Sequence, residues 1–153
     1  MSINRNKPIT RKELFDLIRD KKDVTQIDTS EITDMSWMFR EYRSFNQDIS
    51  KWNVSNVTDM RNMFFNAKSF NQDISNWDVS NVTDMRNMFF KAKLFNQDIS
   101  KWNVSKVTNM KNIFFDTKSF TKDISNWNLS NIKNELNFFI INNTTFRSSI
   151  LFD

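Results

Sequence analysis

Lysine, arginine and aspartate recur in this chain at intervals of 25 residues, which predicts rows of like charge on the folded surface. An ordered row of one sign is suited to bind an oppositely charged partner, whereas neighbouring rows of opposite sign neutralise one another. We expect lateral pairing of acidic and basic rows to dominate, and the first acidic row also to accept backbone N–H groups in a turn. The basic rows are Arg43, Lys68, Lys93 and Lys118, and Arg61, Arg86 and Lys111; the acidic rows are Asp48, Asp73, Asp98 and Asp123, and Asp34, Asp59 and Asp84.

Nucleic acid is one partner that the basic rows suggest, because the chain has 22 Lys and Arg against 18 Asp and Glu and a net charge of +4. Against this, the acidic residues are interleaved with the basic ones. The aromatic residues also occupy core-like positions, where they would offer no stacking platform. A basic strip that binds nucleic acid or another polyanion is therefore the alternative, and a protein partner is the main expectation.

The composition removes most catalytic and metal-binding chemistry. The 153 residues contain no His, no Cys and no Gly. These absences exclude Cys and Ser–His nucleophiles, most zinc sites and the glycine-rich loops that hold phosphates. Repeats that bind calcium also need glycine-rich turns. We expect no enzyme, no catalytic residues, no cofactor and no metal site.

A 25-residue repeat is the strongest pattern in the chain. Copies begin near residues 20, 45, 70, 95 and 120, and segments 45–69 and 70–94 are identical at 21 of 25 positions. A period of this length is typical of stacked coils, in which one unit cannot bury its apolar side chains alone. Positions within a copy are numbered below from these starting residues, so that Phe45, Phe70, Phe95 and Phe120 each occupy position 1.

Apolar residues at positions 1, 5, 8, 10, 13, 16, 19, 20 and 23 predict the inward-facing side chains of each coil. The segment Asp-Ile-Ser-x-Trp predicts a short strand, and the segment from Val-Thr-Asp-Met onward predicts a short helix or 3₁₀ turn. Alternation would turn positions 5 and 7 to one face although only position 5 is apolar, so either the strand ends at position 6 or a bulge intervenes. Asn at positions 2, 9 and 12 is expected to take left-handed turns and to hydrogen-bond along the stack.

These segments predict an α/β repeat solenoid of about five 25-residue coils, each with one short strand and one short helix or 3₁₀ turn. Residues 1–23 form an N-terminal segment with a capping helix over about 10–22, introduced by a capping box from Thr10 to Glu13. The repeats occupy 24–139, and 140–153 form a C-terminal cap.

The repeated segment Phe-Asn-Gln-Asp-Ile-Ser-x-Trp-Asn/Asp-Val-Ser-Asn-Val-Thr-Asp-Met-x-x-Met-Phe resembles the BspA-like leucine-rich-repeat surface proteins, which carry a mycoplasma-type repeat domain of unknown function. The resemblance covers about residues 10–139. It implies a right-handed, leucine-rich-repeat-like stack of coils and a surface or interaction protein, with no catalytic residues defined for the motif. It also implies a cell-surface setting or a viral and host context.

We predict a non-catalytic protein-interaction scaffold that is a monomer and binds a protein rather than nucleic acid. No apolar run reaches signal-peptide or membrane-spanning length, so we expect no membrane span and a cytoplasmic location. The first candidate surface is the predicted strand face, where positions 7 and 9 vary between copies and so are not fixed by packing. Its residues are Asp48, Ser50, Lys51, Asp73, Ser75, Asn76, Asp98, Ser100, Lys101, Asp123, Ser125 and Asn126, and the candidate basic strip is Arg43, Lys68, Lys93 and Lys118.

Overall fold

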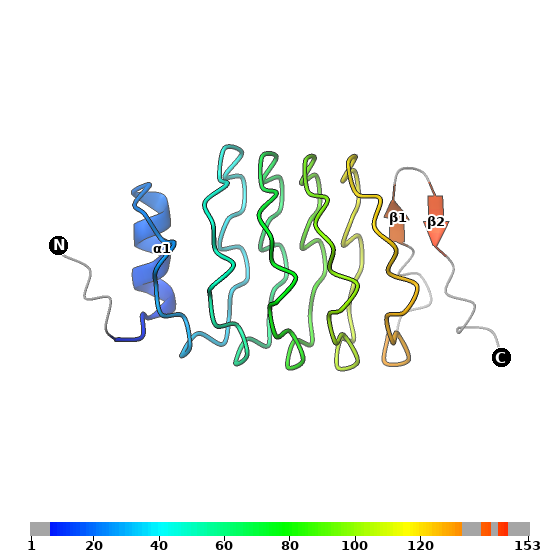
Figure 1. The fold of residues 1–153 in the computed structure, drawn as a ribbon, viewed down its shortest axis with the longest axis horizontal. Helices are drawn as coiled ribbons and strands as arrows, with labels where there is room; N and C mark the ends of the chain where they lie inside the picture. The colour runs from blue at the N-terminus through cyan, green and yellow to red at the C-terminus, as the bar shows by residue number, and fades with distance from the viewer. Residues whose placement is uncertain (1–6, 133–138, 142–143, 147–153) are drawn as a thin grey trace.

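The fold is a row of 25-residue coils that lie side by side along the long axis of the molecule (Figure 1). It comes from a computed structural model, which describes residues 7–132, 139–141 and 144–146. One α-helix, α1 (Arg11–Arg19), precedes the coils. Two short strands, β1 (Phe139–Ile141) and β2 (Thr144–Phe146), follow them.

The predicted α/β solenoid, with a strand and a helix in every coil, is wrong, because residues 20–132 are a series of short turns. In the copy that begins at residue 70, the N–H groups of Trp77, Val82 and Met88 each donate to a carbonyl three residues earlier. Between these turns, the side chains of Asp73 and Asp78 each accept the N–H group two residues later. The chain therefore bends before a strand can form, which explains why position 5 is apolar and position 7 is polar.

Left-handed backbone rules out a helix in the second half of each coil. Positions 18 and 22 have φ between 53° and 64° in the four copies that begin at residues 20, 45, 70 and 95, whereas an α-helix needs φ near about −60°. The predicted left-handed asparagines at positions 2, 9 and 12 are not among these residues, so that prediction is wrong. The residues that take this backbone are Trp37, Glu41, Asn62, Asn66, Asn87, Lys91, Asn112 and Asp116.

Hydrogen bonds between neighbouring coils hold the stack together in place of a continuous β-sheet. N–H groups at positions 16, 18, 20 and 22 donate to carbonyls 24 residues later, as Phe64 does to the carbonyl of Met88 at 2.9 Å. The predicted asparagine bonds along the stack are confirmed at positions 2 and 12, whereas at position 9 Asn53 Oδ1 accepts the N–H of Ser55 within its own coil. Asn71 N–H donates to Asn46 Oδ1 at 2.9 Å, and the side-chain amide of Asn81 donates to a carbonyl of the preceding coil at 2.8 Å.

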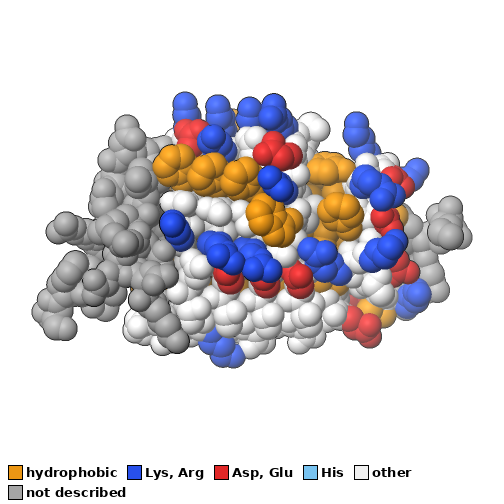
Figure 2. All heavy atoms as spheres, turned by 180° about the vertical axis from the view of Figure 1, so that it is seen from behind, with side chains coloured by type: hydrophobic (Ala, Val, Ile, Leu, Met, Phe, Trp, Pro, Cys, Tyr) orange, Lys and Arg blue, Asp and Glu red, His pale blue; other side chains and the backbone are white. Residues whose placement is uncertain are grey.

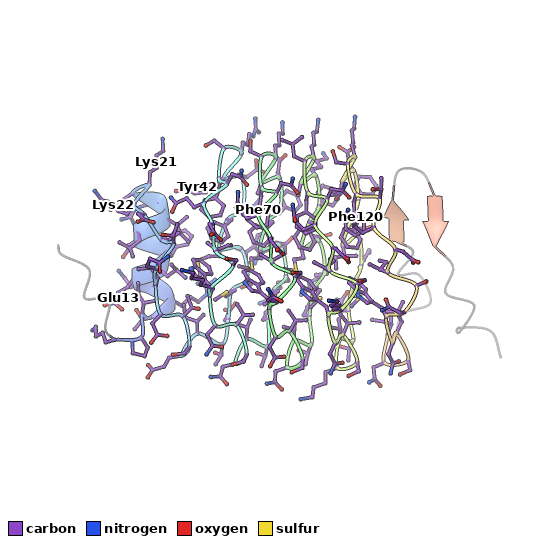
Figure 3. The ribbon with its side chains drawn as sticks, viewed as in Figure 1. Glu13, Lys21, Lys22, Tyr42, Phe70 and Phe120 are labelled. Atoms are coloured by element: carbon purple, nitrogen blue, oxygen red, sulfur yellow. The ribbon has the colours of Figure 1, made fainter. Side chains whose placement is uncertain are left out.

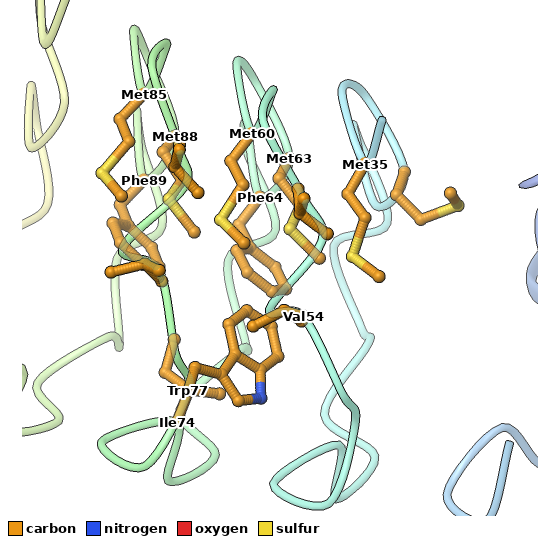
Figure 4. Packing of buried hydrophobic residues seen from close by; sticks show 14 of the residues in the cluster. Met35, Val54, Met60, Met63, Phe64, Ile74, Trp77, Met85, Met88 and Phe89 are labelled. Carbon is orange, nitrogen blue, oxygen red and sulfur yellow. The ribbon is translucent and has the colours of Figure 1, made fainter. Parts of the chain in front are cut away.

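The core is a set of stacked apolar columns, and the burial of the predicted inward positions is confirmed. Figure 4 shows Met60, Met63 and Phe64 of one coil beside the equivalent side chains of the next. Phe64 stacks on the equivalent ring of the next coil with 5.6 Å between ring centroids. The indole Nε1–H of Trp77 crosses between coils to donate to the carbonyl of Ile49 at 3.2 Å. Phe70 and Phe120, marked in Figure 3, belong to the same core.

α1 covers the first coil, as predicted, although it is shorter than expected. The capping box is present, since the Thr10 hydroxyl accepts the N–H of Glu13 and the Glu13 carboxylate accepts the N–H of Thr10. The guanidinium of Arg11 donates to the carbonyls of Asp34 and Ser36 at 3.0 and 2.6 Å. In later coils the equivalent carbonyls accept N–H groups from the preceding coil. Arg11 therefore substitutes for the missing coil at this end.

The predicted C-terminal cap, 140–153, lies mostly outside the described residues. Within them, β1 pairs with β2 in antiparallel register, with Ile140 opposite Thr145.

Candidate binding surface

Three phenylalanines at position 21 form a stacked row on the surface, which we name the phenylalanine ladder: Phe65, Phe90 and Phe115. The first two rings are 4.7 Å apart and inclined by 1°, and the second pair is 4.8 Å apart and inclined by 13°. Phe115 is 36% exposed, and the other two are partly exposed. Among the described residues, position 21 is the repeated apolar position that stays accessible. Figure 2 shows a face on which hydrophobic side chains form a row with Lys and Arg side chains on both sides.

The turn geometry explains why this ring points outward while its neighbour in sequence is buried. Phe64 is fully buried, and its N–H donates to the next coil. Phe65 instead closes a turn, with its N–H donating to the carbonyl of Asn62 at 3.1 Å. Left-handed residues lie on both sides of this pair, at Asn62 and Asn66. Consecutive phenylalanines are therefore directed to opposite sides of the chain.

Cations lie over the faces of several of these exposed rings. Lys91 Nζ is 5.4 Å from the centroid of Phe90. Arg40, which occupies position 21 in the first copy, has its Cζ 5.8 Å from Phe65 and 4.7 Å from Trp37. Such contacts are favourable because the ring face carries negative charge density. The ladder thus ends at a guanidinium on the side of the first coil.

One basic row is neutralised by its acidic neighbour, which confirms the predicted lateral pairing for these residues. Arg61 and Arg86 make ion pairs with the aspartates two residues earlier, at 3.1 and 3.3 Å. Burial raises the pKa of Asp59, the partner of Arg61, and the neighbouring aspartates of the same row raise it further. The next coil has Asn109 at this position, so Lys111 lacks the equivalent ion pair.

The candidate basic strip at position 24 carries charge that is largely uncompensated. Arg43 makes an ion pair with Glu41 at 3.5 Å. Lys68, Lys93 and Lys118 make no ion pair with another described residue. Each of them follows a ladder residue by three positions. The strip and the ladder therefore combine positive charge with exposed aromatic surface.

The first candidate surface, at positions 4 to 7, is placed in turns rather than on a strand. The carboxylates of Asp48, Asp73, Asp98 and Asp123 each accept the N–H of the serine two residues later, at 2.9 to 3.0 Å. These bonds hold the pKa of each carboxyl below its usual value. Figure 4 shows Ile74 and Trp77 near the opposite end of the coil from Met85 and Met88. This surface is therefore not brought together with the ladder.

The sequence interpretation missed the ladder because it placed aromatic residues only at core positions. A signal was present. A Phe-Phe pair follows position 19 in the copies that begin at 45, 70 and 95, whereas the first copy has Phe39 followed by Arg40. A position that accepts arginine in one copy faces solvent, so the second phenylalanine of each pair is the exposed one.

The described residues hold no cluster of three side chains suited to a metal ion. Among the same residues, the structure has no helix that is both long and apolar enough to cross a membrane.

Comparison with known proteins places the chain in a family. The family model described as "Mycoplasma protein of unknown function, DUF285" matches residues 10–99 and 73–151. No curated protein and no solved structure gives a significant match. Since the two matched segments together span most of the sequence, the chain belongs to this mycoplasma-type repeat family of unknown function.

Proposed function

We propose that this chain is a non-catalytic protein-interaction scaffold, as its resemblance to BspA-like repeats also suggests, and that it holds its partner on the phenylalanine ladder. The observation that carries the proposal is the exposure of three stacked rings beside lysines that make no ion pair with another described residue. Aromatic side chains that stay accessible are enriched in protein interfaces because they bury a large area at low entropic cost. The ladder therefore replaces the predicted strand face as the preferred surface.

The stacking geometry favours a protein over single-stranded nucleic acid. Bases bind to aromatic side chains by lying on ring faces. In the ladder, the faces between Phe65, Phe90 and Phe115 are used by the rings themselves, and Arg40 lies over Phe65 on the side of the first coil. Within the stack, ring edges remain, and these suit apolar and polar protein groups better than they suit bases.

The absence of His, Cys and Gly from the whole sequence supports a non-catalytic role, because most nucleophile and phosphate-binding arrangements need one of them. Side chains of one type recur at most positions of the repeat, whereas a catalytic site needs a unique constellation.

Affinity capture with matched variants tests the proposal. The immobilised chain is compared with a Phe65→Ser/Phe90→Ser variant and with Phe15→Ser, which removes a 42% exposed phenylalanine from α1. We expect a protein that is retained by the wild type and by Phe15→Ser at about 150 mM salt to be lost from the ladder variant. Equal retention by the ladder variant would contradict the assignment of the surface. Displacement of the bound protein by single-stranded DNA would favour the polyanion alternative.

A further inference from the structure

We propose that the segment bound on the ladder is an extended acidic peptide that also carries apolar side chains. This inference rests on the function proposed above and specifies the chemistry of the partner. Three features of the described residues carry it: the ring edges, the surrounding charge and the backbone conformation beside the rings.

The ladder presents ring edges to the partner. With interplanar angles of 1° and 13° and centroid separations of 4.7 and 4.8 Å, neighbouring faces cover one another in part, and Lys91 Nζ lies over Phe90. The edge of an aromatic ring carries partial positive charge, whereas the face carries negative charge. The ring edges therefore attract carboxylate and carbonyl oxygens. The carbon atoms of the same edges also make favourable contacts with apolar side chains. A peptide with acidic and apolar side chains satisfies both tendencies.

The charge around the middle of the ladder is positive. Lys91 lies over Phe90, and Lys68 and Lys93 belong to the strip beside it without ion-pair partners among the described residues. At position 22, directly after the ladder position, the copies that begin at residues 20 to 95 carry an acidic residue at the two ends of the row and none in the middle. One of these acidic residues is Glu41, which is engaged by Arg43 and by the side-chain amide of Asn66. The other is Asp116. An acidic partner is therefore complementary to the centre of the surface.

The backbone beside the rings adds a third observation. Position 22 follows each ladder residue and is left-handed in four copies, yet it holds Glu41, Asn66, Lys91 and Asp116. Lysine and glutamate tolerate this conformation less well than asparagine, which already occupies the position once. Lys91, with φ of 57°, therefore keeps a cation beside Phe90 at the expense of backbone strain. Strain of this kind is typical of positions that contribute to binding.

A second copy of the chain fits this surface poorly. Facing ladders would bring the lysines of one strip close to basic side chains of the other copy, and like charges in contact oppose association. The ladder has only two ring-to-ring steps, of 4.7 and 4.8 Å. An extended peptide rises by about 3.3 Å per residue, so about three or four residues cover the rings. The partner is therefore a short linear segment.

Selection from a random peptide library tests the chemistry of the partner. Dodecapeptides displayed on phage are selected on the wild type, on Lys68→Glu/Lys93→Glu, and on the matched control Lys51→Glu/Lys101→Glu. The control makes the same charge change at position 7, in the turns of the first candidate surface. Fluorescence of the buried Trp52, Trp77, Trp102 and Trp127 verifies that each variant is folded.

We expect the wild type and the control to enrich peptides that combine Asp or Glu with apolar residues. A peptide selected in this way should bind Lys68→Glu/Lys93→Glu about tenfold or more weakly, and its affinity should fall as salt is raised. Enriched peptides that depend on Phe65 and Phe90 but show no acidic preference would overturn this inference and leave the proposed function intact. Failure to enrich any ladder-dependent peptide would contradict both. Stronger binding of oligo-dT than of the selected peptide would show that the surface is a general polyanion site.

Discussion

Replacement of Trp77 by phenylalanine tests how the coils are held together. Trp77 is 4% exposed, and its indole Nε1–H donates to the carbonyl of Ile49 in the preceding coil at 3.2 Å. The same bond recurs from Trp102 and Trp127, at 3.1 Å in each case. Phenylalanine removes the donor and shrinks the ring, so the variant probes the hydrogen bond and the packing between coils together.

The expected cost is the sum of two contributions. The smaller ring loses about three buried heavy atoms, which corresponds to about 2 kcal/mol of apolar burial. The lost hydrogen bond adds about 1 kcal/mol, the low end of the roughly 1–3 kcal/mol that a buried polar group costs when it loses its partner. The low end applies because the carbonyl of Ile49 also accepts the N–H of Trp52 at 3.1 Å and so keeps one partner. We expect the free energy of unfolding to fall by about 3 kcal/mol.

Urea unfolding, followed by the fluorescence of the remaining tryptophans, measures this change. The matched control is Trp37→Phe, the same substitution at a residue that is 39% exposed. Its expected cost is under about 1 kcal/mol, the scale of the contact with Arg40. A loss below about 1 kcal/mol for Trp77→Phe, or equal losses for the two variants, would refute the reasoning.

Three further substitutions test the turns and the N-terminal end. Asn87→Ala places alanine at φ of 53° and removes the 3.0 Å hydrogen bond from the Asn87 side chain to Asn62 in the preceding coil. We expect the free energy of unfolding in urea to fall by about 2 kcal/mol. The control Asn76→Ala, at an exposed residue, should change it little. Hydrogen bonds from Ser75 hold the pKa of Asp73 low in the folded chain. The ionised Asp73 carboxylate therefore adds fully to the free energy of unfolding above the pKa of the unfolded chain, about 3.9. This stabilisation is lost as the pH falls through the lower pKa of the folded chain. Asp73→Asn keeps the hydrogen-bond acceptor but removes the titrating group. Between about pH 4 and 2 we therefore expect the urea midpoint to fall less steeply with pH than in the wild type. An equal dependence of the midpoint on pH in the two proteins would contradict this. Arg11→Leu leaves two carbonyls of the first coil without donors and should speed amide hydrogen exchange in that coil, whereas the exposed Lys12→Leu should not.

The period and the buried positions were predictable because they depend only on which residues recur. A column such as Phe64 and Phe89 is apolar in every copy, and burial follows from that pattern. The capping helix was predictable for a similar reason, since the Thr10 and Glu13 capping box is a local signal.

The strand and the helix were wrongly predicted because apolar spacing says nothing about competing hydrogen bonds. Asp73 draws the N–H of Ser75 into a turn, and that bond removes the residue from any strand. Asn87 takes left-handed backbone within the segment predicted to be helical. The pattern of inward positions is the same for a chain of turns as for short regular elements, so periodicity alone does not distinguish them.

The core and the proposed binding surface both depend on the length of the repeat. Phe89 and Phe90 are neighbours in sequence, yet one continues the buried column and the other the exposed ladder. A repeat of 25 residues places each ring over its equivalent, which fixes the 4.7 to 4.8 Å spacing of the ladder. Insertion of a single residue within a coil would shift both columns. Variation at position 22 leaves both columns in place, so substitutions there can alter the charge beside the rings without disturbing the core.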